Sequence, residues 1–136
     1  MANTDKLNSQ ASDNFRLARS QTMVSASDGT YNLIRLPVNA FVMDVWLYMS
    51  TAYSGGSPSI TIGWLGNGET AQPAGFMTNL VAKPLEAGIK RAMKETLEQF
   101  PGKYFNAASG MVTATLAADT GTGGIWQVLV HYSVIV

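Results

Sequence analysis

The most constraining feature of the sequence is the alternation of side chains in residues 125–136, IWQVLVHYSVIV. Its even-numbered positions are all apolar or aromatic, whereas its odd-numbered positions include Gln127, His131 and Ser133. Because successive side chains of a β-strand point to opposite faces, the segment predicts a strand with one continuous apolar face. We expect that face to be covered, either by the protein's own core or by a neighbouring subunit.

The same alternation recurs in other segments. Residues 41–50, FVMDVWLYMS, predict a strand with Phe41, Met43, Val45, Leu47 and Met49 on one face and Val42, Asp44, Trp46, Tyr48 and Ser50 on the other. Similar short runs at 59–64 and 111–117 are separated by turns rich in Gly, Pro and Ser. About seven or eight such strands predict a mainly β protein, an antiparallel β-sandwich or jelly roll.

Two local predictions concern other parts of the chain. Residues 22–27 and 31–36 flank Asp28 and Gly29, a pattern typical of a β-hairpin. Residues 85–100 have apolar side chains at spacings of three and four, which predicts a short amphipathic helix. A strand at 88–93 followed by an irregular loop is the alternative.

The domain organisation is simple. Residues 1–20 are polar, with Leu7, Phe15 and Leu17 as their large apolar side chains, and we interpret them as an extended N-terminal arm. Residues 21–136 suit one β-sandwich domain. No basic region followed by an apolar run opens the sequence, so we expect no secretory signal and synthesis in the cytoplasm.

The low charge content indicates subunit contacts. Charged residues make up 13 % of the chain, against about 25 % in an average soluble domain. A neutral surface of this kind is often covered in an assembly, although a monomer coated with small polar side chains remains the alternative. Nine basic residues balance nine acidic ones, so we expect neither nucleic acid nor a membrane as partner.

No residue pattern predicts catalysis or a bound cofactor. The chain has no cysteine, which excludes thiolate chemistry and cysteine-ligated metal sites. His131 has no nucleophile or carboxylate beside it in the sequence, and Asp44 would need a second carboxylate at a set distance. Asp44 could instead pair with Arg35 if their strands are neighbours. We therefore expect a non-enzymatic protein without catalytic residues, metal or cofactor.

Four aromatic residues offer a different function. Trp46, Tyr48, Tyr53 and Trp64 could form a platform on which sugar rings stack, although aromatic side chains in half-buried strands are ordinary packing elements. A carbohydrate-binding or host-recognition module is accordingly the alternative function.

Three segments carry a resemblance to a known class of proteins. Residues 45–68, VWLYMSTAYSGGSPSITIGWLGNG, residues 100–117, FPGKYFNAASGMVTATLA, and residues 121–136, GTGGIWQVLVHYSVIV, are similar to small virion structural proteins of tailed bacteriophages. The resemblance implies a β-sandwich of the capsid decoration, or cement, type. It also implies location on the virion capsid surface and contact with the major capsid protein. Self-association as a trimer or another homo-oligomer is implied as well.

We expect the contacts with partners to use residues 1–20 and one face of the sandwich. The candidate interface residues are Phe15, Leu17, Asp44, Trp46, Tyr48, Gln127, His131 and Ser133.

Overall fold

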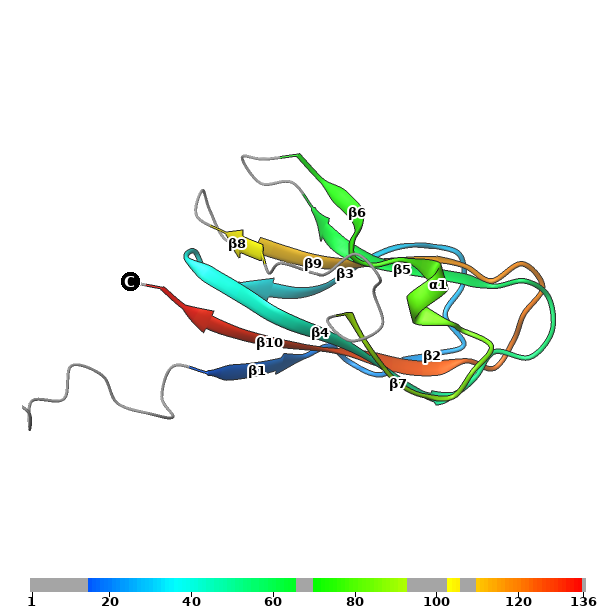
Figure 1. Ribbon diagram of the computed structural model, residues 1–136. Helices are drawn as coiled ribbons and strands as arrows, with labels where there is room; N and C mark the ends of the chain where they lie inside the picture. The colour runs from blue at the N-terminus through cyan, green and yellow to red at the C-terminus, as the bar shows by residue number, and fades with distance from the viewer. Residues whose placement is uncertain (1–14, 66–69, 93–102, 106–109, 136) are drawn as a thin grey trace, which may run out of the picture.

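The computed structural model describes residues 15–65, 70–92, 103–105 and 110–135, and they form two antiparallel β-sheets stacked face to face (Figure 1). Sheet A has the strand order β1 (Arg16–Arg19), β10 (Ile125–Val134), β4 (Ala40–Thr51) and β7 (Gly88–Arg91), with β2 (Met23–Val24) also paired to β10 and β8 (Lys103–Phe105) also paired to β4. Sheet B has the order β3 (Gly29–Leu36), β9 (Gly110–Ala117), β5 (Ser59–Leu65) and β6 (Gln72–Met77). The predicted mainly β, antiparallel class is confirmed.

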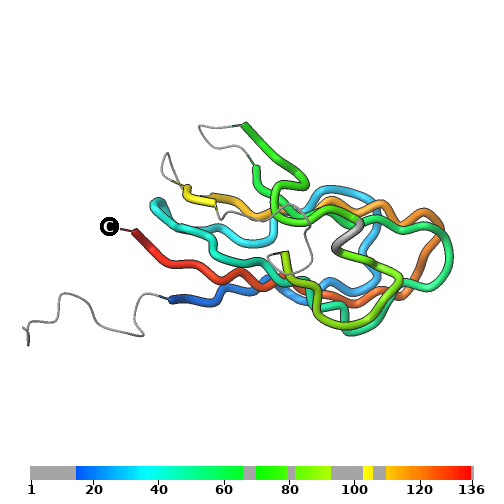
Figure 2. The backbone as a smooth tube through the Cα atoms, viewed as in Figure 1, coloured from blue at the N-terminus to red at the C-terminus, as the bar shows by residue number. Residues whose placement is uncertain are grey.

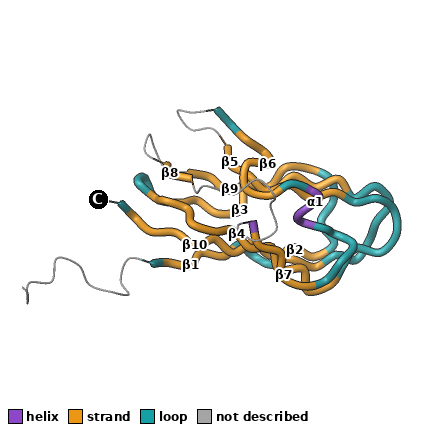
Figure 3. Tube along the Cα trace, viewed as in Figure 1, coloured by secondary structure: helices purple, strands orange, loops and turns teal. Residues whose placement is uncertain are grey.

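The remaining described segments connect the strands. The four-residue helix α1 (Asn79–Ala82) follows β6, and the described loops gather mostly at one end of the two sheets (Figure 3). The first and last described strands, β1 and β10, run side by side in sheet A, as the blue and red segments of Figure 2 show. Segments from opposite ends of the described chain therefore pair in one sheet.

Strand β10 is an interior strand of sheet A, and its even-numbered face packs into the core. Trp126 is 1 % exposed, and Val128 and Val130 are fully buried. Residues of sheet B such as Ile62 and Ala114 belong to the same core. The predicted inward face of the terminal strand is confirmed for these residues.

Strand β4 departs from the predicted alternation at one point. Asp44 lies opposite His131, whereas Val42 lies opposite the next residue of β10, so Met43 is an extra residue in β4. A β-bulge of this kind moves the following side chains to the other face. As a result Val42 is buried with Val45, and the prediction that Met43 shares the face of Val45 is wrong.

The predicted hairpin around Asp28 and Gly29 is also wrong. Strand β2 pairs with β10 in sheet A, whereas β3 pairs with β9 in sheet B. Residues 25–28 therefore cross from one sheet to the other. Local turn signals do not distinguish a hairpin from such a crossing, because both need the same turn residues.

The helix predicted over 85–100 is wrong at residues 88–91, which form strand β7 as in the alternative prediction. Ile89 of β7 lies opposite Tyr48 of β4. Gly88 has a φ of 117°, which favours glycine and does not occur inside a right-handed helix. Pairing satisfies the backbone groups at the edge of β4, so tertiary structure overrides a weak helical period. Residues 93–102 lie outside the described residues.

Ser20, the residue after β1, makes hydrogen bonds to the backbone of β10. Its backbone N–H donates to the Val128 carbonyl at 2.8 Å, and its hydroxyl oxygen accepts from the Val128 N–H at 2.9 Å. The hydroxyl also donates to the Gln21 carbonyl at 2.9 Å, and Ser20 is only 5 % exposed. Residues 16–20, the end of the segment interpreted as an arm, are thus built into sheet A.

We expect Ser20→Ala to lower the free energy of unfolding by about 1–3 kcal/mol, because it leaves the buried Val128 N–H without a partner. Urea unfolding measures this change. The matched control is Ser50→Ala. The Ser50 hydroxyl donates to the Ile125 carbonyl of β10 but is exposed, and we expect its loss to cost under about 0.5 kcal/mol. Equal losses in the two variants would contradict the role given to Ser20.

Candidate functional site

The solvent-facing side of sheet A, here called the outer face, carries side chains from neighbouring strands in cross-strand rows. Strand pairing fixes these rows, since residues opposite one another in a sheet point to the same side. The rows are Leu17–His131–Asp44, Arg19–Leu129–Trp46–Arg91, Gln127–Tyr48–Ile89 and Ser133–Phe41–Tyr104.

The outer face exposes large apolar side chains. Leu17 is 56 % exposed, Ile89 52 %, and Tyr48 and Tyr104 are each 40 % exposed. Phe15, which leads into β1, is 68 % exposed. Exposed apolar side chains grouped on one surface are typical of an interaction site, whereas isolated ones need no explanation.

A polar cluster lies beneath this apolar surface. The Asp44 Oδ2 atom accepts hydrogen bonds from Trp46 Nε1 at 2.6 Å and from Arg91 Nε and Nη2 at 3.2 and 3.1 Å. The Asp44 Oδ1 atom accepts from the Val45 N–H at 2.9 Å. Asp44 is 5 % exposed. It therefore orients Trp46 and Arg91 and does not itself present a charge to a partner.

The position of Asp44 explains why a carboxylate occurs inside an apolar strand. Strand β4 pairs with β10 along one edge. Along its other edge it pairs with β8 over residues 40–42 and with β7 over residues 46–49, so residues 43–45 lie in the gap between β8 and β7. The Asp44 carboxylate accepts a hydrogen bond from the backbone N–H of Val45 in that gap. The suggested pairing with Arg35 is wrong, because Arg35 lies on β3 in sheet B opposite Met111.

His131 packs against aromatic and apolar neighbours on the outer face. Its ring centroid lies 4.6 Å from that of Trp46, with a tilt of 48° between the rings. Leu17 lies opposite it on β1. Its Nε2 atom is buried and has no hydrogen-bond partner within the described part of the chain. This geometry gives His131 a packing role beside Trp46.

The structure brings seven of the eight candidate interface residues onto the outer face. They are Leu17, Asp44, Trp46, Tyr48, Gln127, His131 and Ser133, and Phe15 directly precedes β1. Sequence reasoning missed Arg19, Phe41, Ile89, Arg91, Tyr104 and Leu129. The odd-numbered position of Leu129 in the last strand was a usable signal. Arg19, Ile89 and Arg91 lay in segments interpreted as arm or helix, which concealed their alternation.

The four aromatic residues considered as a sugar platform do not share a surface. Trp46 and Tyr48 lie on the outer face, whereas Tyr53 is 4 % exposed and belongs to the core. Trp64 belongs to sheet B and packs against Phe76 and Phe105, with centroid distances of 4.9 and 6.3 Å. The predicted platform is therefore wrong, because the strands direct these rings to different places.

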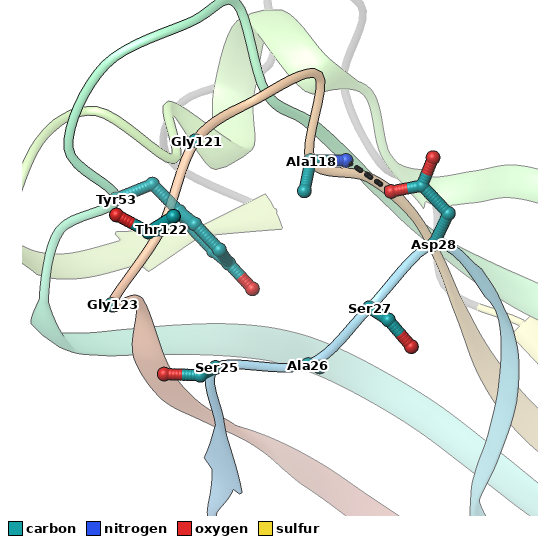
Figure 4. Close-up of a pocket in the computed structure, with 9 residues that line it drawn as sticks. All are labelled: Ser25, Ala26, Ser27, Asp28, Tyr53, Ala118, Gly121, Thr122 and Gly123. Carbon is teal, nitrogen blue, oxygen red and sulfur yellow. Dashed lines mark hydrogen bonds between the residues drawn. The ribbon is translucent and has the colours of Figure 1, made fainter.

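A hollow of about 510 Å³ lies between residues 25–28 and 118–123, with Tyr53 projecting into it (Figure 4). The polar groups around it are used within the protein. Asp28 Oδ1 accepts from the Ala118 N–H at 2.7 Å, and Trp126 Nε1 donates to the Tyr53 hydroxyl at 3.3 Å. Burial raises the pKa of that hydroxyl. The Ser25 and Ser27 hydroxyls point away from it, so the hollow has no converging set of side chains for a ligand (Figure 4).

The described residues offer neither a metal site nor a membrane-spanning helix. Within residues 15–65, 70–92, 103–105 and 110–135, no group of three or more His, Asp or Glu side chains could hold a metal ion. Within the same residues, no helix is long and apolar enough to cross a membrane.

The fold resembles those of chains in known structures, although the sequence matches no known family. No protein-family model matches the sequence, and no curated protein matches it. Three solved phage capsid structures contain similar chains. One, from the acidic stable capsid of Helicobacter pylori bacteriophage KHP30, has a TM-score of 0.63 and 17 % identity, covering 88 % of this chain and 87 % of that one.

The other two similar chains come from further phages. The match in the capsid asymmetric unit of cyanophage Pam1 has a TM-score of 0.63 and 15 % identity, covering 99 % of this chain and 97 % of that one. The match in the capsid of Ralstonia phage GP4 has a TM-score of 0.66 and 18 % identity, covering 91 % and 86 %. The chain therefore shares the fold of chains in phage capsids. At the level of the fold, the resemblance inferred from the sequence is confirmed.

Proposed function

We propose that this protein is a non-enzymatic structural protein of a phage virion, of the capsid decoration or cement type. In this role it binds the head shell from outside and stabilises it. The observation that carries the proposal is an exposed apolar outer face on a fold shared with chains of three phage capsid structures. An exposed apolar face is costly in solution and becomes favourable when a partner covers it.

The proposed partners are the major capsid protein and further copies of this chain. The outer face of sheet A supplies one contact surface, and residues 1–20, of which 16–20 belong to sheet A, supply another. A homo-oligomer, such as a trimer, would place several outer faces on neighbouring capsid subunits at once, which raises the overall affinity without new contacts. The proposed location is the capsid surface, after synthesis in the host cytoplasm.

The test uses phage heads assembled without this protein and the purified wild-type chain. We expect saturable co-sedimentation of the chain with heads at about micromolar concentration, as for a stable interface of standard size. We also expect bound heads to release their DNA at a higher temperature, because a ligand that binds the intact state stabilises it. Absence of binding to heads would contradict the proposal.

A further inference from the structure

We infer that the partner surface covering the outer face of sheet A carries carboxylate groups on both sides of an apolar centre. The inference rests on the proposed function, which makes this face a contact surface. It goes further by assigning the chemistry of the partner and by excluding a second copy of the same face as the occupant.

Two arginines flank the apolar centre of the outer face. Arg19 on β1 and Arg91 on β7 stand at opposite ends of one row, with Leu129 and Trp46 between them. Adjacent strands lie about 4.8 Å apart, so three strand spacings separate their Cα atoms by about 14 Å. Arg19 is exposed, and the Arg91 side chain is 42 % exposed. A cation thus flanks the apolar centre on each side.

Arg91 is held in place before any partner binds. Two of its nitrogens donate to Asp44 Oδ2, and its Cζ atom lies 5.0 Å from the centroid of the Trp46 ring. A guanidinium has five N–H donors, so this arrangement leaves donors for a second carboxylate. Because its side chain is already ordered, Arg91 loses little conformational entropy on binding.

The exposed charges of the described outer face have one sign. Among the described residues, Asp44 is the one carboxylate on the outer face, and it is buried and hydrogen-bonded. The other described carboxylates, Asp28, Glu86 and Asp119, lie in segments between strands. Asp28 and Asp119 bond to the backbone N–H groups of Ala118 and Ser57. The charge that the described side chains of this face expose to solvent is therefore positive, because Arg19 is exposed and Arg91 is more exposed than the Asp44 carboxylate with which it pairs.

A second copy of the same face does not fit this pattern. In a two-fold symmetric contact each surface patch meets itself. Arginines at both ends of a row would then meet arginines, with no exposed carboxylate among the described residues of the face to pair with them. Like charges brought together across an interface cost several kcal/mol. The occupant that fits is a different surface, one that carries carboxylates.

The test measures binding of variants to heads that lack this protein. We expect Arg19→Glu to weaken binding about tenfold or more and Arg19→Lys, which keeps the charge, to bind nearly as well as the wild type. The matched control is Arg35→Glu, an exposed arginine of sheet B, which should bind like the wild type. Wild-type affinity should also fall about tenfold between about 50 and 300 mM NaCl, since salt screens exposed charges.

Each contrary outcome has a distinct meaning. If the wild type binds heads, and Arg19→Glu and Arg91→Gln each bind heads with the affinity of the wild type, the inference is overturned while the proposed function stands. An equal loss in Arg35→Glu would overturn it too. A wild-type dimer in solution that Arg19→Glu disrupts would assign the face to a second copy. Failure of the wild type itself to bind heads would instead refute the proposed function. Urea unfolding of each variant verifies its fold.

Discussion

Trp126→Ala is expected to remove about 3–5 kcal/mol from the free energy of unfolding, the range for a fully buried large aromatic residue. Trp126 is 1 % exposed in β10, the strand paired with β1, β2 and β4. Its removal leaves a cavity between the two sheets and takes away the hydrogen bond to the Tyr53 hydroxyl. Since domains of this size have a total stability of about 5–15 kcal/mol, the variant should be close to unfolding.

The adjacent residue provides the control. Gln127 lies on the outer face of the same strand, and we expect Gln127→Ala to change stability by less than about 0.5 kcal/mol. Trp126→Phe retains an aromatic ring without the N–H, so its loss of unfolding free energy should lie between those of Trp126→Ala and Gln127→Ala. Urea unfolding followed by circular dichroism measures all three. A loss under about 1 kcal/mol for Trp126→Ala would show that the terminal strand does not contribute to the core.

The terminal strand could be predicted from sequence because its information is local. Trp126, Val128 and Val130 form an unbroken apolar set, whereas the residues between them include Gln127, and a period of two identifies both a strand and its buried face. The same alternation predicted that the odd-numbered side chains of this strand belong to the candidate interface. Gln127, His131 and Ser133 share one side of β10, and pairing extends that side onto β4 and β1.

The features that sequence reasoning missed depend on pairing between distant segments. The extra residue Met43 has no signature of its own, since its strand alternates normally on either side of the bulge. Ile89 and Arg91 lie in a segment whose apolar spacing also fits a helix, and the available edge of β4 decides the outcome. Asp44 gains its role from Arg91, which lies 47 positions further along the chain.

The structural role of Asp44 links the fold to the proposed contact surface. A carboxylate at the bulge satisfies the backbone of β4 and also fixes the indole of Trp46 and the guanidinium of Arg91. Aromatic and arginine side chains that are ordered before binding are typical of residues that dominate interface energies. The irregularity in β4 and the candidate interface are thus parts of one arrangement.

The most direct test of the central claim, that the outer face of sheet A binds the head shell, measures the affinity of Ile89→Asp and Tyr48→Asp for heads lacking the protein. Both side chains are exposed, so their replacement should change stability by no more than about 0.5 kcal/mol. A carboxylate buried in an apolar contact, and facing a partner that carries carboxylates, should weaken binding about 100-fold, or by about 3 kcal/mol.

Leu65→Asp is the matched control for this measurement, because Leu65 is 48 % exposed at the end of β5 in sheet B. We expect Leu65→Asp to bind heads like the wild type, while Ile89→Asp and Tyr48→Asp lose nearly all binding in co-sedimentation. Wild-type affinity in both outer-face variants, or an equal loss in Leu65→Asp, would contradict the account.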